Sequence, residues 1–138
     1  MTSTQVGLAK YTRLIIIFTI CAILVAAVML LPKGFSDDVS KIGQGTNVVV
    51  LTHNKNSVQS LELMELLNTV RSDYEEMVEF LVVDIDTREG QVFIRREGVS
   101  FGASVLVLFG GDGARKGILA GSISEKELRS ALDGIFSH

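Results

Sequence analysis

The chain has 138 residues, of which 13 are basic, 16 are acidic and one is a cysteine. This length allows one compact domain with a short appendage, and a lone cysteine excludes a disulfide within the chain. Three basic residues lie in the first 33 positions, which leaves ten basic and 16 acidic residues for the remainder. Such an acidic remainder excludes nucleic acid as the expected partner.

An apolar segment near the start, LIIIFTICAILVAAVMLL (residues 14–31), contains no charged residue. As a helix it would be roughly 27 Å long, close to the hydrocarbon thickness of a bilayer. A buried core helix is the competing interpretation, but a domain this small cannot cover such a helix on every side. The sequence therefore predicts a transmembrane signal anchor over residues 14–32.

The flanking charges predict the orientation of this span. Lys10 and Arg13 precede it, whereas Lys33 follows it and is soon offset by two aspartates. Because basic residues near a span tend to stay in the cytoplasm, residues 1–13 are expected to be cytoplasmic. We expect a single-pass protein of the bacterial inner membrane whose C-terminal part is periplasmic.

A cleaved signal peptide is an open alternative for the same segment. Gly34 and Ser36 would supply the small residues that a signal peptidase requires, but the apolar run exceeds the usual 7–15 residues of a signal core. Within the span, Cys21 is interpreted as a small apolar residue. Ala22 and Ala26 form a small-xxx-small pair, which makes them the candidate contact with another membrane helix.

Residues 33–46 mix glycine, serine, aspartate and lysine without apolar periodicity. Such a composition is typical of a flexible tether. The folded domain is therefore expected to occupy residues 47–138.

The first half of this domain has the pattern strand, helix, strand. Short apolar runs at residues 47–51 and 80–86 predict buried strands. Between them lies a predicted helix from residue 58 to about 74, because apolar residues recur at helical spacing, namely Val58, Leu61, Met64, Leu67 and Val70. A crossover of this length indicates a parallel βαβ unit.

The second half begins with a helix that we expect Asp86 to cap, with Glu89 as its capping-box partner. That helix should end before Gly98. Strands follow at 104–109 and 115–121, joined by the GGDG turn. Ser124 and Glu127 start a last helix with the apolar stripe Leu128, Leu132, Ile135 and Phe136. The order βαβαββα predicts an α/β domain with helices on both faces of a mixed four-stranded sheet.

At FGASVLVLFGGDG (residues 101–113) the chain resembles the thioredoxin fold family. The family has Gly-hydrophobic-Pro-Thr there, followed by an apolar strand that ends in Phe and a glycine turn. Gly102, Ala103, Val105 and Phe109 fall into step with this pattern, and the resemblance extends over about residues 46 to 137. It implies a thioredoxin-like fold, and by itself it says nothing about activity.

The departures from the family lie at its chemistry. The resemblance aligns the Trp-Cys-x-x-Cys site with residues 54–59, which contain no cysteine. The cis-proline of the family aligns with Ser104, where a trans peptide is expected because a cis bond before a non-proline residue costs about 2.5–4 kcal/mol. Ser57 has no base beside it to activate its hydroxyl. We therefore expect a redox-inactive protein that is not an enzyme and holds no cofactor.

The residues around the lost redox site form the candidate docking surface: His53, Asn54, Asn56, Ser57, Gly102, Ala103 and Ser104. His53 follows the first strand, where open α/β sheets bind ligands. One histidine without a second ligand is not a metal site, so we expect a solvated loop histidine.

These observations favour a membrane-tethered accessory or assembly subunit of a larger envelope complex. Its expected partners are the lipid bilayer and other membrane or envelope proteins. One alternative is a thiol-disulfide or chaperone-like factor that uses the cysteines of a partner. Another is a small-ligand sensor that binds through His53.

Overall fold

The protein was analysed as a computed structural model, which describes residues 2–31 and 34–136. It divides into two units, Met1–Gly34 and Phe35–His138. Pro32 and Lys33, where the predicted span meets the predicted tether, lie outside the described residues, as do Met1, Ser137 and His138.

The first unit is one helix, α1 (Thr2–Leu30). Its segment Gly7–Leu30 has a mean hydropathy of 2.8 and is long and apolar enough to cross a membrane. None of its most apolar window is buried, so α1 is not a core helix of the described structure. A signal sequence near the N-terminus can pass the same test of length and composition, and that alternative therefore stays open.

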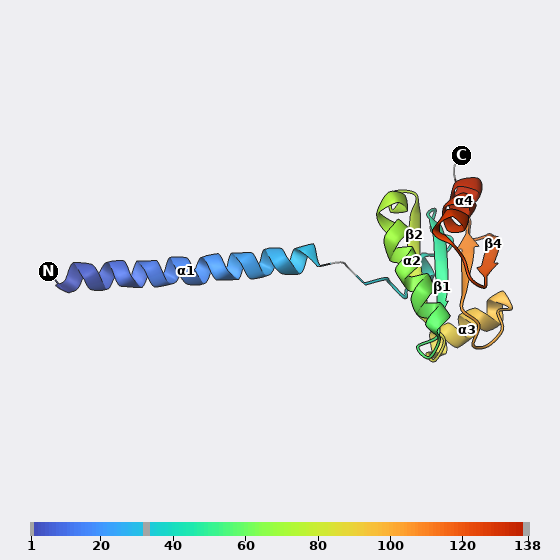
Figure 1. Cartoon of the computed structure of the whole chain (residues 1–138), viewed down its shortest axis with the longest axis horizontal. Helices are drawn as coiled ribbons and strands as arrows, with labels where there is room; N and C mark the ends of the chain where they lie inside the picture. The colour runs from blue at the N-terminus through green and yellow to red at the C-terminus, as the bar shows by residue number, and fades with distance from the viewer. Residues whose placement is uncertain (1, 32–33, 137–138) are drawn as a thin grey trace. The chain divides into compact units, whose positions relative to one another are not determined.

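The second unit is built on the predicted mixed sheet, with strand order β2-β1-β3-β4 (Figure 1). Its strands are β1 (Asn47–His53), β2 (Val78–Asp84), β3 (Val105–Phe109) and β4 (Arg115–Ala120). β1 pairs in parallel with β2 and antiparallel with β3, and β3 forms a hairpin with β4. Residues 48–51 are fully buried, as expected for a central strand whose β-branched side chains pack on both faces.

Helices cover both faces of this sheet. α2 (Val58–Tyr74) and α4 (Glu125–Phe136) pack on one face, where Leu67 and Leu132 meet Val49 and Leu108. α3 (Arg88–Glu97) packs on the other face through Phe93 and Ile94. The predicted stripe of α4 and its capping box are confirmed, because Ser124 and Glu127 bond each other's backbone N–H groups at 3.2 and 2.7 Å.

The segment predicted as a tether is part of the folded unit from Phe35 onward. The Ser36 carbonyl accepts a hydrogen bond from the Val82 N–H at 2.9 Å, and Ser36 bridges the edge strand β2 at Leu81. Val39 begins a short 3-10 helix, η1 (Val39–Lys41), and packs on the α3 side of the core. Sequence analysis did not predict this packing, because the segment is irregular and its few apolar residues do not recur at a regular spacing.

The predicted cap of α3 was wrong, and the predicted apolar stripe of α2 was wrong at Val58 and Leu61 only. The cap of α3 is Thr87, whose hydroxyl accepts the Gly90 N–H at 3.0 Å, while Asp86 lies in the preceding turn. In α2 the buried face contains Leu63, Leu67, Val70 and Tyr74, whereas Val58 is 71 % and Leu61 is 51 % exposed. Two apolar stripes at helical spacing overlap in this sequence, and the periodicity did not decide which one faces the sheet.

Replacing Phe35 by alanine should destabilise the domain, because Phe35 packs on the α2–α4 side of the core and the Arg71 guanidinium lies 4.5 Å from its ring centroid. We expect a loss of about 1–3 kcal/mol in the free energy of unfolding, less than for a fully buried phenylalanine. Chemical denaturation of a fragment of residues 34–138 measures it. Phe101→Ala is the matched control, since Phe101 is 72 % exposed; equal effects of the two substitutions would contradict a structural role for the segment.

Candidate functional site

Three hydroxyl groups, those of Thr52, Ser60 and Ser104, lie buried below the turn between β1 and α2 and form what we call the hydroxyl cluster. The Ser104 hydroxyl donates to the Ser60 hydroxyl at 2.8 Å. The Thr52 hydroxyl accepts the Val105 N–H at 3.0 Å and donates to the Ala103 carbonyl at 2.9 Å. These bonds join the end of β1 and the start of α2 to the segment that leads into β3.

The turn above the cluster is closed by its own side chains. Ser57 caps α2 by accepting the Ser60 N–H at 3.3 Å, and the Asn54 N–H donates to the Ser60 hydroxyl at 2.8 Å. The Asn54 carboxamide accepts the Asn56 N–H at 3.0 Å and reaches the Gly102 carbonyl at 3.4 Å. The Ser57 hydroxyl and the Asn54 carboxamide, which sequence analysis proposed for recognition, therefore stabilise the loop itself.

The candidate docking surface is only partly brought together at the surface. Asn56 is exposed, and His53, Asn54, Ser57, Gly102 and Ala103 are half-buried. Ser104 is 4 % exposed and is therefore buried below this surface rather than part of it. Every described peptide bond is trans, which confirms the trans geometry expected at Ser104. Gly102 has φ +84°, a conformation that glycine adopts without strain.

His53 is not the solvated loop histidine that we expected. It is the last residue of β1 and pairs in register with Asp84 of β2, and its carbonyl accepts the Ile85 N–H at 3.1 Å. Its Nδ1 atom is buried and has no hydrogen-bond partner within the described part of the chain. No cluster of His, Cys, Asp and Glu residues suited to a metal ion occurs among the described residues.

Beside His53, Lys55 and Asp84 form an ion pair with 2.8 Å between Nζ and Oδ2. Asp84 also accepts the Asp86 N–H at 2.9 Å. The hydrogen bond from Lys55, together with that from the Asp86 backbone, holds the pKa of Asp84 below its usual value. A carboxylate kept ionised in this way is poorly suited to donate a proton.

Three exposed apolar side chains flank this turn, Val58, Leu61 and Phe101, and we call them the apolar rim. Sequence analysis did not predict their exposure. Val58 follows the cap Ser57, Leu61 lies one turn further along α2, and Phe101 precedes Gly102. They are 71, 51 and 72 % exposed, respectively. A phenylalanine between serine and glycine in a loop was the available signal for Phe101, whereas Val58 and Leu61 were assigned to the core stripe.

The site contains no sulfur. The single cysteine of the sequence, Cys21, is exposed in α1 together with Ala22 and Ala26. A hydroxyl is far less acidic than a thiol, and the serine hydroxyls here are already engaged in hydrogen bonds to the backbone or to each other. These hydrogen bonds hold the loop in place.

No protein-family model matches the chain, and no characterised protein matches it in sequence. Among solved structures it is similar to oxidised thioredoxin O2 from Arabidopsis thaliana, with a TM-score of 0.59 and 19 % sequence identity. The match covers 70 % of this chain and 84 % of the thioredoxin. The fold of the domain is thioredoxin-like. At this identity the likeness extends to the fold alone.

Removing the Ser60 hydroxyl should be costly because it leaves the Asn54 N–H and the Ser104 hydroxyl without their acceptor. We expect Ser60→Ala to lower the free energy of unfolding by about 1–3 kcal/mol, measured by chemical denaturation of residues 34–138. Ser130→Ala, at an exposed position of α4, should change it by less than about 0.5 kcal/mol. Similar values for the two variants would show that the hydroxyl cluster contributes nothing.

The Lys55–Asp84 pair should make stability depend on pH. Because the folded state lowers the pKa of Asp84, the pair stabilises above the unfolded pKa of about 3.9 and is lost as pH falls through the lower folded value. Asp84→Asn should cost less than about 1 kcal/mol at pH 7, and this difference from the parent should vanish in acid. Denaturation curves at several pH values, with Asp86→Asn as the control, measure it; a difference that persists at low pH would contradict the ion pair.

Proposed function

We propose that this chain is a redox-inactive, membrane-anchored thioredoxin-like protein that serves as an accessory or assembly subunit of a larger complex in a bacterial envelope. The observation that carries the proposal is the use of the site's polar groups for structure: Ser57, Ser60 and Asn54 bond the loop rather than a substrate. A domain that keeps its fold without a reactive group is suited to binding.

The apolar rim supports protein as the partner. Val58, Leu61 and Phe101 are large apolar side chains that stay exposed beside a loop held rigid by hydrogen bonds. Exposed aromatic and aliphatic anchors with polar surroundings are typical of protein interfaces. The rim, together with the exposed Asn56, is therefore the surface that we assign to the partner.

The anchor favours a partner in or at the membrane. The apolar composition of α1 and its preceding Lys10 and Arg13 support a single span with the domain outside the cytoplasm. Ala22 and Ala26 are the small residues through which a second membrane helix would pack. A thiol-disulfide role would need cysteines from a partner, since the domain sequence contains none.

Placing charges on the apolar rim should release the partner. We expect the full chain, purified in mild detergent, to bring down a specific set of membrane proteins, and Val58→Asp with Phe101→Asp to reduce their recovery by at least about fivefold. Met77→Asp is the matched control, because Met77 is also an exposed apolar residue, 40 % accessible, but lies in the turn between α2 and β2.

Equal recovery by the parent, the double variant and Met77→Asp would contradict docking through the rim. In that event, a second pair of variants tests the anchor. Ala22 and Ala26 are replaced by leucine, and the control replaces Ile16 and Ile23 by leucine. Unchanged recovery in both would mean that the chain has no assembly role. Loss of the partners only with the alanine replacements would locate recognition in the span.

A further inference from the structure

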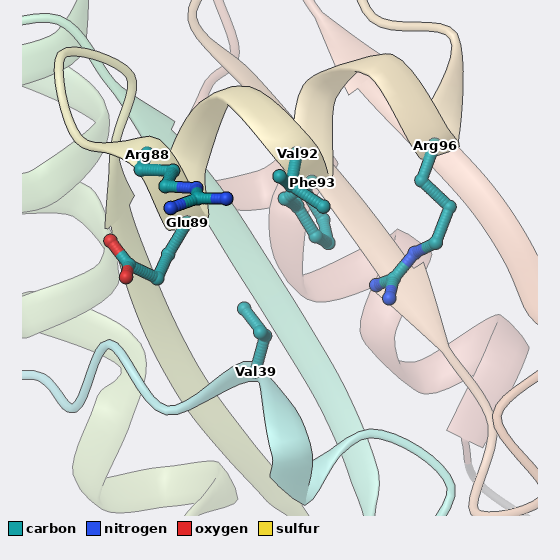
Figure 2. Close-up of a pocket in the computed structure, with 6 residues that line it drawn as sticks. All are labelled: Val39, Arg88, Glu89, Val92, Phe93 and Arg96. Carbon is teal, nitrogen blue, oxygen red and sulfur yellow. The ribbon is translucent and has the colours of Figure 1, made fainter.

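A second candidate site lies on the α3 side of the sheet and shares no residue with the docking surface. It is a pocket of about 210 Å³ lined by Val39, Arg88, Glu89, Val92, Phe93 and Arg96 (Figure 2). Drug-sized ligands usually occupy cavities of about 300–1,000 Å³. A pocket this small is better matched to one apolar side chain of a larger partner.

Both walls of the pocket are held firmly. The Thr87 hydroxyl donates to the Asp84 carbonyl at 2.7 Å, and a Cβ at Gly90 would meet that carbonyl oxygen at 1.9 Å, so only glycine allows α3 to approach β2 this closely. Phe93 is buried beneath the helix. Opposite, Val39 starts η1, which Asp38 caps, and packs on the same core cluster. The cavity is therefore preformed.

Two arginines flank the apolar part of this pocket. Arg88, Val92 and Arg96 follow one another at intervals of four residues and so share one face of α3. Figure 2 shows the apolar side chains of Val39, Val92 and Phe93 between the two guanidinium groups. Val92 is 51 % exposed although it is apolar. Its exposure between two cations leaves a surface that is both apolar and positively charged.

The positive charge is available for binding. Within the described residues no carboxylate lies within ion-pair distance of Arg88 or Arg95, and Arg96 contacts Glu97, a carboxylate that Arg115 also approaches. The Arg96 guanidinium lies 5.5 Å from the Phe93 ring centroid. Glu89 lines the opposite end of the pocket and points away from Arg96 (Figure 2). Beyond residue 33 the chain has 16 acidic and ten basic residues, which makes this basic face an exception.

We propose that the α3 pocket binds an extended segment of a partner protein in which a bulky apolar residue lies between two acidic residues. Arg88 and Arg96 are eight helical residues apart, or about 12 Å. An extended peptide advances about 3.3 Å per residue and shows alternate side chains on one face. Acidic residues at positions 1 and 5 therefore span the two arginines, and an apolar residue at position 3 faces the pocket.

This pattern favours a peptide over an anionic lipid. The phosphatidylglycerol headgroup offers one anionic centre, whereas the pocket has its apolar floor between two cations. The proposal stands independently of docking through the apolar rim, because the two surfaces lie on different elements.

The test uses the full chain in phosphatidylcholine nanodiscs captured on a surface plasmon resonance chip. The probe is the capped peptide Gly-Glu-Ser-Leu-Ser-Glu-Gly, and the comparison peptides replace Leu by Ser or both Glu residues by Lys. We expect the probe to bind at least about fivefold more tightly than either comparison peptide. Equal binding of the three peptides would overturn the proposal.

Variants locate the binding. Val92→Asp and Arg96→Gln should each weaken the probe by at least about fivefold, whereas Lys126→Gln, which removes an equal charge from the exposed surface of α4, should not. Thermal unfolding of each variant verifies its fold. An equal loss with Lys126→Gln would show general charge attraction, and no loss with Val92→Asp would show that the peptide binds elsewhere; either result would overturn the site. Competition by soluble dihexanoyl phosphatidylglycerol, but not by its choline analogue, would assign the pocket to lipid and also overturn it.

Discussion

The hydrogen bond between the Ser104 and Ser60 hydroxyls, 2.8 Å long, joins the two segments on which the candidate docking surface depends. One is the turn from β1 into α2, and the other leads from α3 into β3. Because Ser60 also accepts the Asn54 N–H, one buried oxygen fixes the loop, the start of α2 and the entry to β3 together. Buried hydroxyl groups are tolerated only when they are paired, and here they pair with each other and with the backbone.

This pairing explains how a thioredoxin-like fold remains intact without sulfur at the turn. The hydroxyls of Thr52, Ser60 and Ser104 are buried, whereas Val58, Leu61 and Phe101 of the apolar rim are exposed. A rigid loop with exposed apolar anchors loses little conformational entropy on binding. These features are the basis on which we propose recognition rather than catalysis for this surface.

Sequence analysis predicted the sheet and its helices because long apolar runs and capping residues are local signals. It located the domain start at residue 47, whereas Phe35 and Ser36 already pack on the edge of the sheet. Phe35 and Ser36 contact residues that are distant from them in the sequence, and no local sequence pattern predicts such contacts. The same limit applies to Ser104, which was proposed as a surface residue: only the fold shows that its hydroxyl faces Ser60.

For the site, composition alone predicted only which reactive residue types are absent. A missing cysteine pair can be read directly, but the burial of the His53 Nδ1 atom and the exposure of Val58 follow from which face each element turns to the sheet. The arginine-flanked pocket on α3 could not be predicted from the sequence either, because Val39 and Arg96 are separated by two strands and a helix along the chain.

The most direct test of this account is a turnover assay of the full chain in detergent with dithiothreitol and insulin as the protein disulfide. With the serine hydroxyls engaged in structure and no cysteine in the domain, the rate of disulfide reduction should equal the rate without protein, and Ser57→Ala should behave identically. An active thioredoxin run in parallel establishes that turnover would be detected. A rate above the uncatalysed one that falls in Ser57→Ala would contradict the claim that this site is structural.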